Sequence, residues 1–222
     1  MIVGKGLIAK AYKNFNLHKN IIIFASGVSN SKEFRKKEFA RERDLLIKNL
    51  DKKKKIIYFS TFGIEESSIH NDYIRHKLKM EKIVFSNKNY LIFRLPQLVG
   101  NSNNKNTLLN YFYNKIIKDK KIYLFSNHTR NIIDVRDVVK ITKYFIKKKF
   151  TNAIINVGNE KYFNVVKIIE IMCAYLKKKP KIEIIKVKKN HEVQNINLDL
   201  SSKKFNINFD NNYLVRVIKK YY

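Results

Sequence analysis

The stretch IVGKGLIAKAY, residues 2–12, places two glycines and an alanine between a short apolar run and a helical pattern. Gly4, Gly6 and Ala9 have the spacing Gly-x-Gly-x-x-Ala. In a dinucleotide-binding turn the first glycine permits the turn and the second lets a pyrophosphate approach the backbone, while the small third residue lets the helix pack closely on the strand. The pattern alone is a weak signal, but it stands in the context that such a turn requires.

Short apolar runs alternate with longer segments of helical period along most of the chain. The runs are MIV (1–3), NIIIFAS (20–26), KIIYFST (55–61), YLIFRLP (90–96) and NAIINVG (152–158). Between them, apolar residues recur near i, i+3, i+4 and i+7, as in amphipathic helices. Alternating strands and helices need crossovers and bury a parallel sheet between two helical layers. We therefore expect a doubly wound, mostly parallel α/β fold of the Rossmann type.

The pattern changes after about residue 160. A helical segment at 164–179 is followed by Pro180, an alternating run KIEIIKV at 181–187 and a last helical segment at 213–222. This order predicts a Rossmann-like dinucleotide-binding domain over residues 1–158. It also predicts a small α+β lobe over residues 159–222, on the substrate side, that does not fold independently.

The glycines mark one edge of the expected sheet. All six lie at the carboxyl end of an apolar run or just past it: Gly4, Gly6, Gly27, Gly63, Gly100 and Gly158. Ligands bind at this edge of open α/β sheets, where loops meet helix N-termini and a residue without Cβ lets a ligand approach. Gly63 and Gly158, taken singly, are equally typical of plain turns.

Charge alone points to a polyanion. The chain has a net charge of +29, but 39 of its 47 basic residues are lysines, and they are dispersed among asparagines and isoleucines throughout the sequence. Surfaces that read phosphates and bases rely on arginine forks and on a clustered basic patch. Nucleic acid is therefore disfavoured as the main ligand.

Other classes of site are also disfavoured. A single cysteine, Cys173, excludes an intrachain disulfide and a cysteine-rich zinc site, and the five histidines lack metal-ligand spacing. No segment approaches the roughly 20 apolar residues of a membrane span. We expect no metal, no membrane partner and a cytoplasmic location.

A candidate proton-transfer site follows the third apolar run. Thr61 ends that run, and Tyr73 and Lys77 stand four residues apart on the next helical segment, so they share one face. A nearby ammonium would lower the pKa of the phenol from about 10 toward the working pH, and a hydroxyl at the strand end would orient a substrate oxygen. The alternative is a solvated helix surface in a lysine-rich chain.

At this point the sequence resembles the extended short-chain dehydrogenase/reductase family, whose members are NAD(P)-dependent epimerases, dehydratases and reductases of nucleotide-sugars. The shared order of motifs carries the resemblance. Besides the glycine turn, the motifs are FASGVSNS (24–31), YFST (58–61), YIRHK (73–77), FRLPQLVG (93–100), RNIIDVRDVV (130–139) and INVGNEKYFNVVKIIEIM (155–172).

The resemblance implies a cofactor, NAD or NADP, and a catalytic trio of Thr61, Tyr73 and Lys77, with Tyr73 as acid/base and Ser60 as a hydroxyl able to substitute for Thr61. The residues that it assigns to the cofactor are Gly4, Gly6, Leu7, Ile8, Ala25, Ser26, Gly27, Ser60, Tyr73, Lys77, Leu95 and Pro96.

Two departures from the family stand out. Val3 and Ala9 occupy the outer positions of the usual Gly-x-x-Gly-x-x-Gly turn. The first helical segment also leads directly into NIIIFAS, which matches the family's fourth strand, so the second and third strands are missing. The second strand normally ends in the acidic residue that binds the adenosine ribose. The choice between NAD and NADP therefore cannot be read.

Substrate residues are also implied by the resemblance. Arg130 is expected to bind the diphosphate of a nucleotide-sugar, for which a guanidinium fork is suited. The alternative is an ion pair with Asp134 or Asp137. Asn106 is a second substrate candidate or an N-cap, and Arg94 is expected to be structural.

The resulting interpretation is a truncated NAD(P)-dependent oxidoreductase or epimerase acting on a nucleotide-sugar, which the family places in surface polysaccharide biosynthesis. Phe62 and Gly63 stand where family dehydratases carry an Asp-Glu pair, so dehydration is less favoured. One alternative is a non-catalytic member that binds a nucleotide or a partner, and another is a nucleic-acid-binding protein. A homodimer is expected by resemblance, whereas charge alternation predicts a solvated face for the helix at 36–50.

Overall fold

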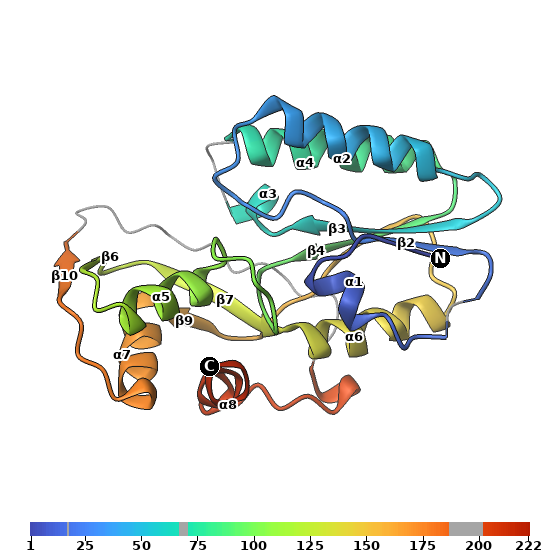
Figure 1. Cartoon of the computed structure of the whole chain (residues 1–222). Helices are drawn as coiled ribbons and strands as arrows, with labels where there is room; N and C mark the ends of the chain where they lie inside the picture. Colours follow the sequence, from blue (N-terminus) through green and yellow to red (C-terminus); the bar gives the residue numbers. More distant parts are fainter. Residues whose placement is uncertain (17, 67–70, 187–201) are drawn as a thin grey trace. The chain divides into compact units, whose positions relative to one another are not determined.

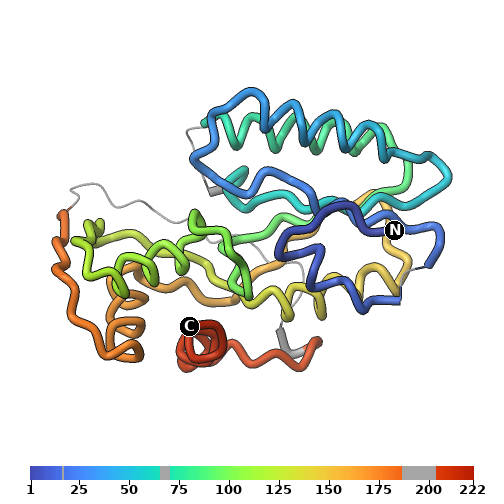
Figure 2. Tube along the Cα trace, viewed as in Figure 1, coloured from blue at the N-terminus to red at the C-terminus, as the bar shows by residue number. Residues whose placement is uncertain are grey.

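A computed structural model describes residues 1–16, 18–66, 71–186 and 202–222 (Figure 2). The chain divides into two compact units that are described separately. Of the described residues, unit 1 comprises Met1–Leu95 and Val135–Val157, and unit 2 comprises Pro96–Asp134 and residues 158–186 and 202–222. Residues 96–134, which the sequence interpretation placed in the first domain, thus group with the second unit. The division into a domain over 1–158 and a lobe over 159–222 stays a prediction.

Unit 1 is a parallel sheet with helices on both faces. Its strands are β1 (Ile2–Val3), β2 (Ile21–Phe24), β3 (Lys55–Thr61), β4 (Tyr90–Leu95) and β8 (Ala153–Asn156), in the order β1-β2-β3-β4-β8. All four pairings are parallel. The doubly wound α/β fold expected from the sequence is confirmed. Within the described residues no strand of this sheet lies beyond β1, as expected for a chain without the family's second and third strands.

Two helical layers cover this sheet. Helices α2 (Lys36–Asn49) and α4 (Asp72–Phe85) lie over one face, and α1 (Leu7–Ala11) and α6 (Val135–Lys147) lie over the other (Figure 1). The short α3 (Gly63–Glu66) follows β3. Because both faces are covered, β3 is a continuous apolar run that is buried from Ile56 to Ser60.

The N-terminus of α4 is fixed by a side-chain cap. The Asn71 side chain accepts a hydrogen bond from the backbone N–H of Ile74 at 2.9 Å, which satisfies one of the free donors of the first turn. This cap determines where Tyr73 and Lys77 stand on the helix. Both residues are buried.

The described part of unit 2 contains two small sheets and three longer helices. In one sheet β5 (Gln97–Val99) pairs parallel with β7 (Thr129–Asp134), which pairs antiparallel with β9 (Tyr162–Asn164). In the other, β6 (Ile122–Phe125) pairs parallel with β10 (Ile182–Ile185). The helices are α5 (Leu108–Ile117), α7 (Val165–Leu176) and α8 (Tyr213–Tyr221), with a 3-10 turn at Ser202–Phe205.

The C-terminal helix is tied into unit 2 through the buried Asp134. The Tyr213 hydroxyl accepts a hydrogen bond from the Asp134 backbone N–H at 2.8 Å, and Lys220 and Tyr221 both donate to the Asp134 carboxylate. Across the described part of the chain, no helix is both long enough and apolar enough to cross a membrane.

Candidate active site

The glycine turn after β1 has the backbone that the sequence requires. Gly4 has φ 131°, a conformation that residues with a side chain rarely adopt, and a Cβ there would collide with the carbonyl of Ala25. A Cβ built at Gly6, the N-cap of α1, would meet no atom within 4 Å. Gly4 is therefore needed for packing, whereas Gly6 leaves open space beside the backbone.

Other residues assigned to a cofactor lie along the same carboxyl edge of the sheet in unit 1. Leu7 and Ile8 form the first turn of α1, Ala25, Ser26 and Gly27 directly follow β2, and Leu95 ends β4. Pro96 belongs to unit 2.

Ser60, near the end of β3, has a buried Oγ without a hydrogen-bond partner among the described residues. An orphaned hydroxyl and an open glycine on one sheet edge fit a polar ligand such as a dinucleotide.

The structure brings two members of the predicted trio close together. Thr61 ends β3, and its side chain is near enough to the Tyr73 phenol, in the first turn of α4, to lower the pKa of that phenol. The Lys77 Nζ, one turn further along α4, lies 5.9 Å from the centroid of the Tyr73 ring. The solvated-helix alternative is wrong for this pair, since Tyr73 is 8% and Lys77 is 2% exposed.

Burial raises the pKa of the Tyr73 phenol above its ordinary value of 10, and this effect is larger than the lowering by the charge of Lys77 and by the Thr61 side chain. Lys77 thus acts in the expected direction, but the net direction of the pKa is upward. A further carboxylate, Glu42, also raises it. The free chain therefore holds the phenol in its protonated form at neutral pH.

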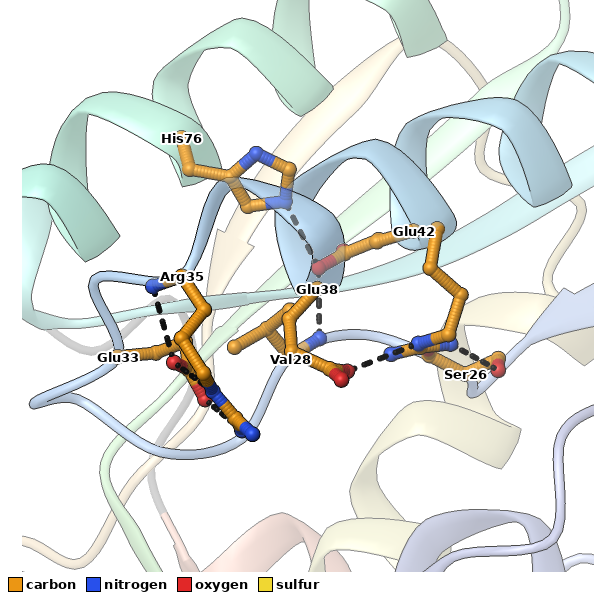
Figure 3. A network of polar contacts seen from close by, with 8 residues as sticks. Ser26, Val28, Glu33, Arg35, Glu38, Glu42 and His76 are labelled. Atoms are coloured by element: carbon orange, nitrogen blue, oxygen red, sulfur yellow. Dashed lines mark hydrogen bonds and ion pairs between the residues drawn. The ribbon is translucent and has the colours of Figure 1, made fainter.

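Glu42 is a site residue that the sequence analysis missed. The charge alternation of KKEFARERDLLIKNL predicted a solvated face, yet Glu42 on α2 is fully buried. Its Oε2 accepts from the Val28 backbone N–H at 2.6 Å and lies 2.9 Å from His76 Nε2 (Figure 3). A signal was present in the sequence, since Leu46, one turn further along α2, is a core residue on the same face.

The other oxygen of Glu42 faces the predicted catalytic lysine. Oε1 accepts hydrogen bonds from Lys77 Nζ at 3.0 Å and from the Tyr58 hydroxyl at 2.7 Å, and Lys77 also donates to that hydroxyl at 3.1 Å. Burial raises the pKa of the Glu42 carboxyl, but the charge of Lys77 and the hydrogen bonds from His76, Val28 and Tyr58 together outweigh it and lower the pKa. Glu42 and Lys77 thus form a buried ion pair.

Gly27 makes room for this ion pair. A Cβ at Gly27 would lie 2.6 Å from Lys77 Nζ and 3.0 Å from Glu42 Oε1. The missing side chain is therefore required by Lys77 and Glu42, whereas the sequence reading explained it only by the approach of a ligand.

Arg94 makes the ion pairs expected of a structural residue. Its guanidinium, on β4, donates from Nε and Nη2 to the Glu81 carboxylate at 3.1 and 2.7 Å, and from Nη1 to Glu65 at 2.6 Å. The ion pairs join β4 to α4 and α3. This arrangement supports the expectation that Arg94 braces the fold.

The two candidate substrate residues lie in unit 2. Arg130 is half-buried on β7, and its Nη1 donates to the backbone carbonyl of Thr129 at 2.7 Å. Asn106 is exposed, and its backbone N–H donates to the Asn104 side chain at 3.0 Å. Because Thr107 is the N-cap of α5, the N-cap alternative for Asn106 is wrong.

Several solved structures share the fold. The Bordetella bronchiseptica enzyme WbmH in complex with NAD+ superposes with a TM-score of 0.70 at 15% identity, over 91% of this chain and 73% of that chain. The Helicobacter pylori ADP-L-glycero-D-manno-heptose-6-epimerase gives 0.66 at 18% identity, over 92% and 72%. The UDP-N-acetylglucosamine 4-epimerase from Methanobrevibacter ruminantium M1 in complex with UDP-N-acetylmuramic acid gives 0.63 at 14% identity, over 97% and 79%.

The sequence itself matches a family model. No curated protein matches the chain. The model of the NAD dependent epimerase/dehydratase family matches residues 46–158, just over half of the chain, which include the whole predicted trio and Arg94. This match agrees with the expected nicotinamide cofactor and with the resemblance found in the motifs. The chain belongs to the NAD dependent epimerase/dehydratase family.

Proposed function

We propose that the chain is an NAD(P)-dependent enzyme that transfers a hydride at a sugar carbon of a nucleotide-sugar, with Tyr73 as the acid/base. The observation that carries this proposal is that Tyr73 and Lys77 are both buried beside the end of β3, where Thr61 stands, with the Lys77 Nζ 5.9 Å from the centroid of the Tyr73 ring. The open backbone at Gly6 on the same sheet edge and the hydride chemistry that the family name implies support it.

In unit 1, some of the residues would hold the dinucleotide and others would transfer the proton. A bound dinucleotide would supply or accept the hydride. The backbone around Gly6, Leu7 and Ile8 would hold its pyrophosphate, and the buried Ser60 hydroxyl would donate to a polar group of the ligand. Thr61 would orient the substrate oxygen while Tyr73 moves the proton.

Tyr73 has a role in both directions of the reaction. Burial raises its pKa, so the free chain presents a neutral phenol, which can donate a proton to a ketone oxygen in the reduction of a keto-sugar. In the oxidation of a hydroxyl, the ionised phenol would accept the proton. Epimerisation would add a return of the hydride to the other face of the carbon.

Arg130 and Asn106 are proposed for the substrate. A diphosphate binds a guanidinium fork through charge-assisted hydrogen bonds, each contributing roughly 1.5–3 kcal/mol. Arg130→Ala should weaken binding of the nucleotide-sugar about tenfold or more and leave dinucleotide binding unchanged. Arg216→Ala is the control, because Arg216 is exposed and pairs with Asp210 in the same unit. Equal loss in both variants would contradict the assignment.

A second candidate is a non-catalytic member of the family that binds a nucleotide-sugar or a partner. Two observations favour it: Lys77 is already paired with Glu42, and the described sheet ends at β1, where the family's adenosine-binding wall would continue. A homodimer and a place in surface polysaccharide biosynthesis also remain proposals. Sedimentation velocity at several protein concentrations would test the homodimer.

Calorimetric titration separates the candidates. The nucleotide-stripped protein would be titrated with NADH, NADPH and a panel of nucleotide-sugars at physiological salt. Micromolar binding of one dinucleotide supports the enzyme, and binding of a nucleotide-sugar without any dinucleotide supports the non-catalytic member. Saturable, length-selective binding of a polynucleotide at that salt would favour the nucleic-acid alternative over both.

A further inference from the structure

Glu42 is enclosed by four groups from three different segments. The loop after β2 supplies the Val28 N–H, β3 supplies Tyr58, and α4 supplies both His76 and Lys77. Both carboxylate oxygens are used, and no part of the side chain is exposed. Such complete enclosure fixes the carboxylate in one position.

Lys77 needs a counter-charge at its location. Its side chain is 3% exposed, and burial of an amine disfavours the charged form. Among the described residues, Glu42 is the one carboxylate that pairs with Lys77. A lysine without that partner would tend to lose its proton and with it any charge effect on a phenol or a ligand hydroxyl.

The position of the ammonium is as constrained as its charge. Nζ lies 3.0 Å from Glu42 Oε1 and 3.1 Å from the Tyr58 hydroxyl, against the bare backbone of Gly27. It stands 5.2 Å and 5.9 Å from the ring centroids of Tyr58 and Tyr73. The contacts with Glu42 and Tyr58 use two of its three N–H donors, which leaves one for a ligand.

We propose that Glu42 is a positioning residue of the proton-transfer site, which keeps Lys77 protonated and fixes its Nζ beside Gly27. Glu42 stands outside the predicted trio and on a different helix. Its catalytic meaning rests on the proposed function, but the charge of Lys77 is measurable without any substrate or cofactor.

A titration of Lys77 would also depend on the ionisable groups around it. The titratable or charged side chains that face this network are Glu42 from α2, Tyr58 from β3, and Tyr73 and His76 from α4. Both phenols have raised pKa values because they are buried, so near neutral pH Glu42 is the anion of the set. Replacing its carboxylate by an amide removes that negative charge with little change of shape.

The first test is an NMR titration of the lysine side chains labelled with 13C at Cε. In the folded wild type burial already lowers the pKa of a different lysine, Lys55. In Glu42→Gln a further lysine signal should move to lower pH than in wild type, and that signal should disappear in Glu42→Gln/Lys77→Arg. Glu38→Gln is the matched control, since Glu38 lies one turn earlier on α2, is partly exposed and pairs with Arg41. A folded Glu42→Gln without a displaced lysine overturns the proposal.

The second test links the charge to ligand binding. In Glu42→Gln, dinucleotide affinity should fall about tenfold or more near pH 9 and return to within about twofold of wild type near pH 6, where Lys77 regains its proton. A loss of affinity that is independent of pH would mean that Glu42 only supports the fold, and would overturn its positioning role. Wild type that binds no dinucleotide would refute the proposed function and leave the NMR test standing.

A third variant covers the case in which Glu42→Gln does not fold. If the cost arises from an uncompensated Lys77 charge, Glu42→Gln/Lys77→Met should fold, because the charge that lacked a partner is gone. A double variant that also fails to fold would overturn the proposal.

Discussion

Two ion clusters of unit 1, one around Arg94 and one around Lys77, differ in how many carboxylates contact the cation. The Arg94 guanidinium contacts Glu81 and Glu65 through Nε, Nη1 and Nη2, so two carboxylates surround one cation. Lys77 has one carboxylate, Glu42, and one hydroxyl, Tyr58. The first cluster joins secondary-structure elements, while the second holds a charge in place and keeps a donor for a further partner. The number of counter-ions thus separates a structural cation from a candidate catalytic one, although both lie beside the same sheet.

The largest expected difference between the two clusters is the effect of substitutions on turnover. Tyr73→Phe should lower turnover of an identified nucleotide-sugar by about 10²–10⁴, because it removes the proton donor, while Arg94→Lys, which keeps one charge in the other cluster, should change turnover far less. Steady-state kinetics on both purified variants measures the difference. Unchanged turnover in Tyr73→Phe would remove the proton-transfer assignment and make the two clusters equivalent.

When a cation is removed, the loss of stability should be larger where the carboxylate that it paired with is more buried. Lys77→Met removes the ammonium from the fully buried Glu42, which keeps its contacts with Val28, Tyr58 and His76, and should lower the free energy of unfolding by about 3–5 kcal/mol. Arg94→Met also leaves Glu81 unpaired, but Glu65 is 34% exposed and regains water, so we expect a loss of about 2–3 kcal/mol. Urea unfolding gives both values. The reverse order would show that Arg94 carries the more demanding pair.

Two glycine substitutions separate packing from ligand approach. Gly27→Ala should cost about 1–3 kcal/mol of stability, because the new methyl group displaces Lys77 and Glu42. Gly6→Ala meets open space and should change stability by less than about 0.5 kcal/mol while weakening dinucleotide binding. Thermal unfolding and calorimetry on both variants check this. Equal stability of the two would argue against a fixed ion pair beside Gly27.

The smallest expected effect is the change in the free energy of unfolding with pH. The pKa of Glu42 is lowered in the folded chain, so this group stabilises the fold above its unfolded value of about 4.5, and the contribution is lost as pH falls below that value. One such proton changes the free energy of unfolding by at most about 1.4 kcal/mol per pH unit. The difference in stability between wild type and Glu42→Gln should therefore shrink from pH 6 toward pH 3. A constant difference would mean that the carboxylate titrates normally.

Much of the fold follows from local pattern. The run KIIYFST became β3 with the same bounds, and the segment 71–86 became α4, because hydrophobic period and an asparagine cap are local properties. The three-residue strands β5 and β9 were not expected, since each is defined only by pairing with the distant β7. Short strands of this kind carry no period of their own.

Part of the candidate site could likewise be predicted from the local sequence, and part of it could not. Thr61, Tyr73 and Lys77 could be predicted as one candidate site because a strand end and a four-residue helical spacing are visible in the local sequence. Glu42 was missed because Arg41 and Arg43 flank it and make its segment look solvated. Its burial depends on a contact with Lys77, 35 residues away, and the raised pKa of Tyr73 depends on that same packing. Charge patterns along one helix cannot predict which member faces another helix.

The burial of Lys77 also makes it an intrinsic reporter of motion. Among 39 lysines, most of which stand in water, this amine is closed in by α2, β3 and the loop after β2. A reagent that acylates accessible amines would modify the surface quickly and reach Lys77 only when α4 separates locally from its neighbours. Its rate of acylation, read by mass spectrometry, would therefore measure how often this part of the protein opens.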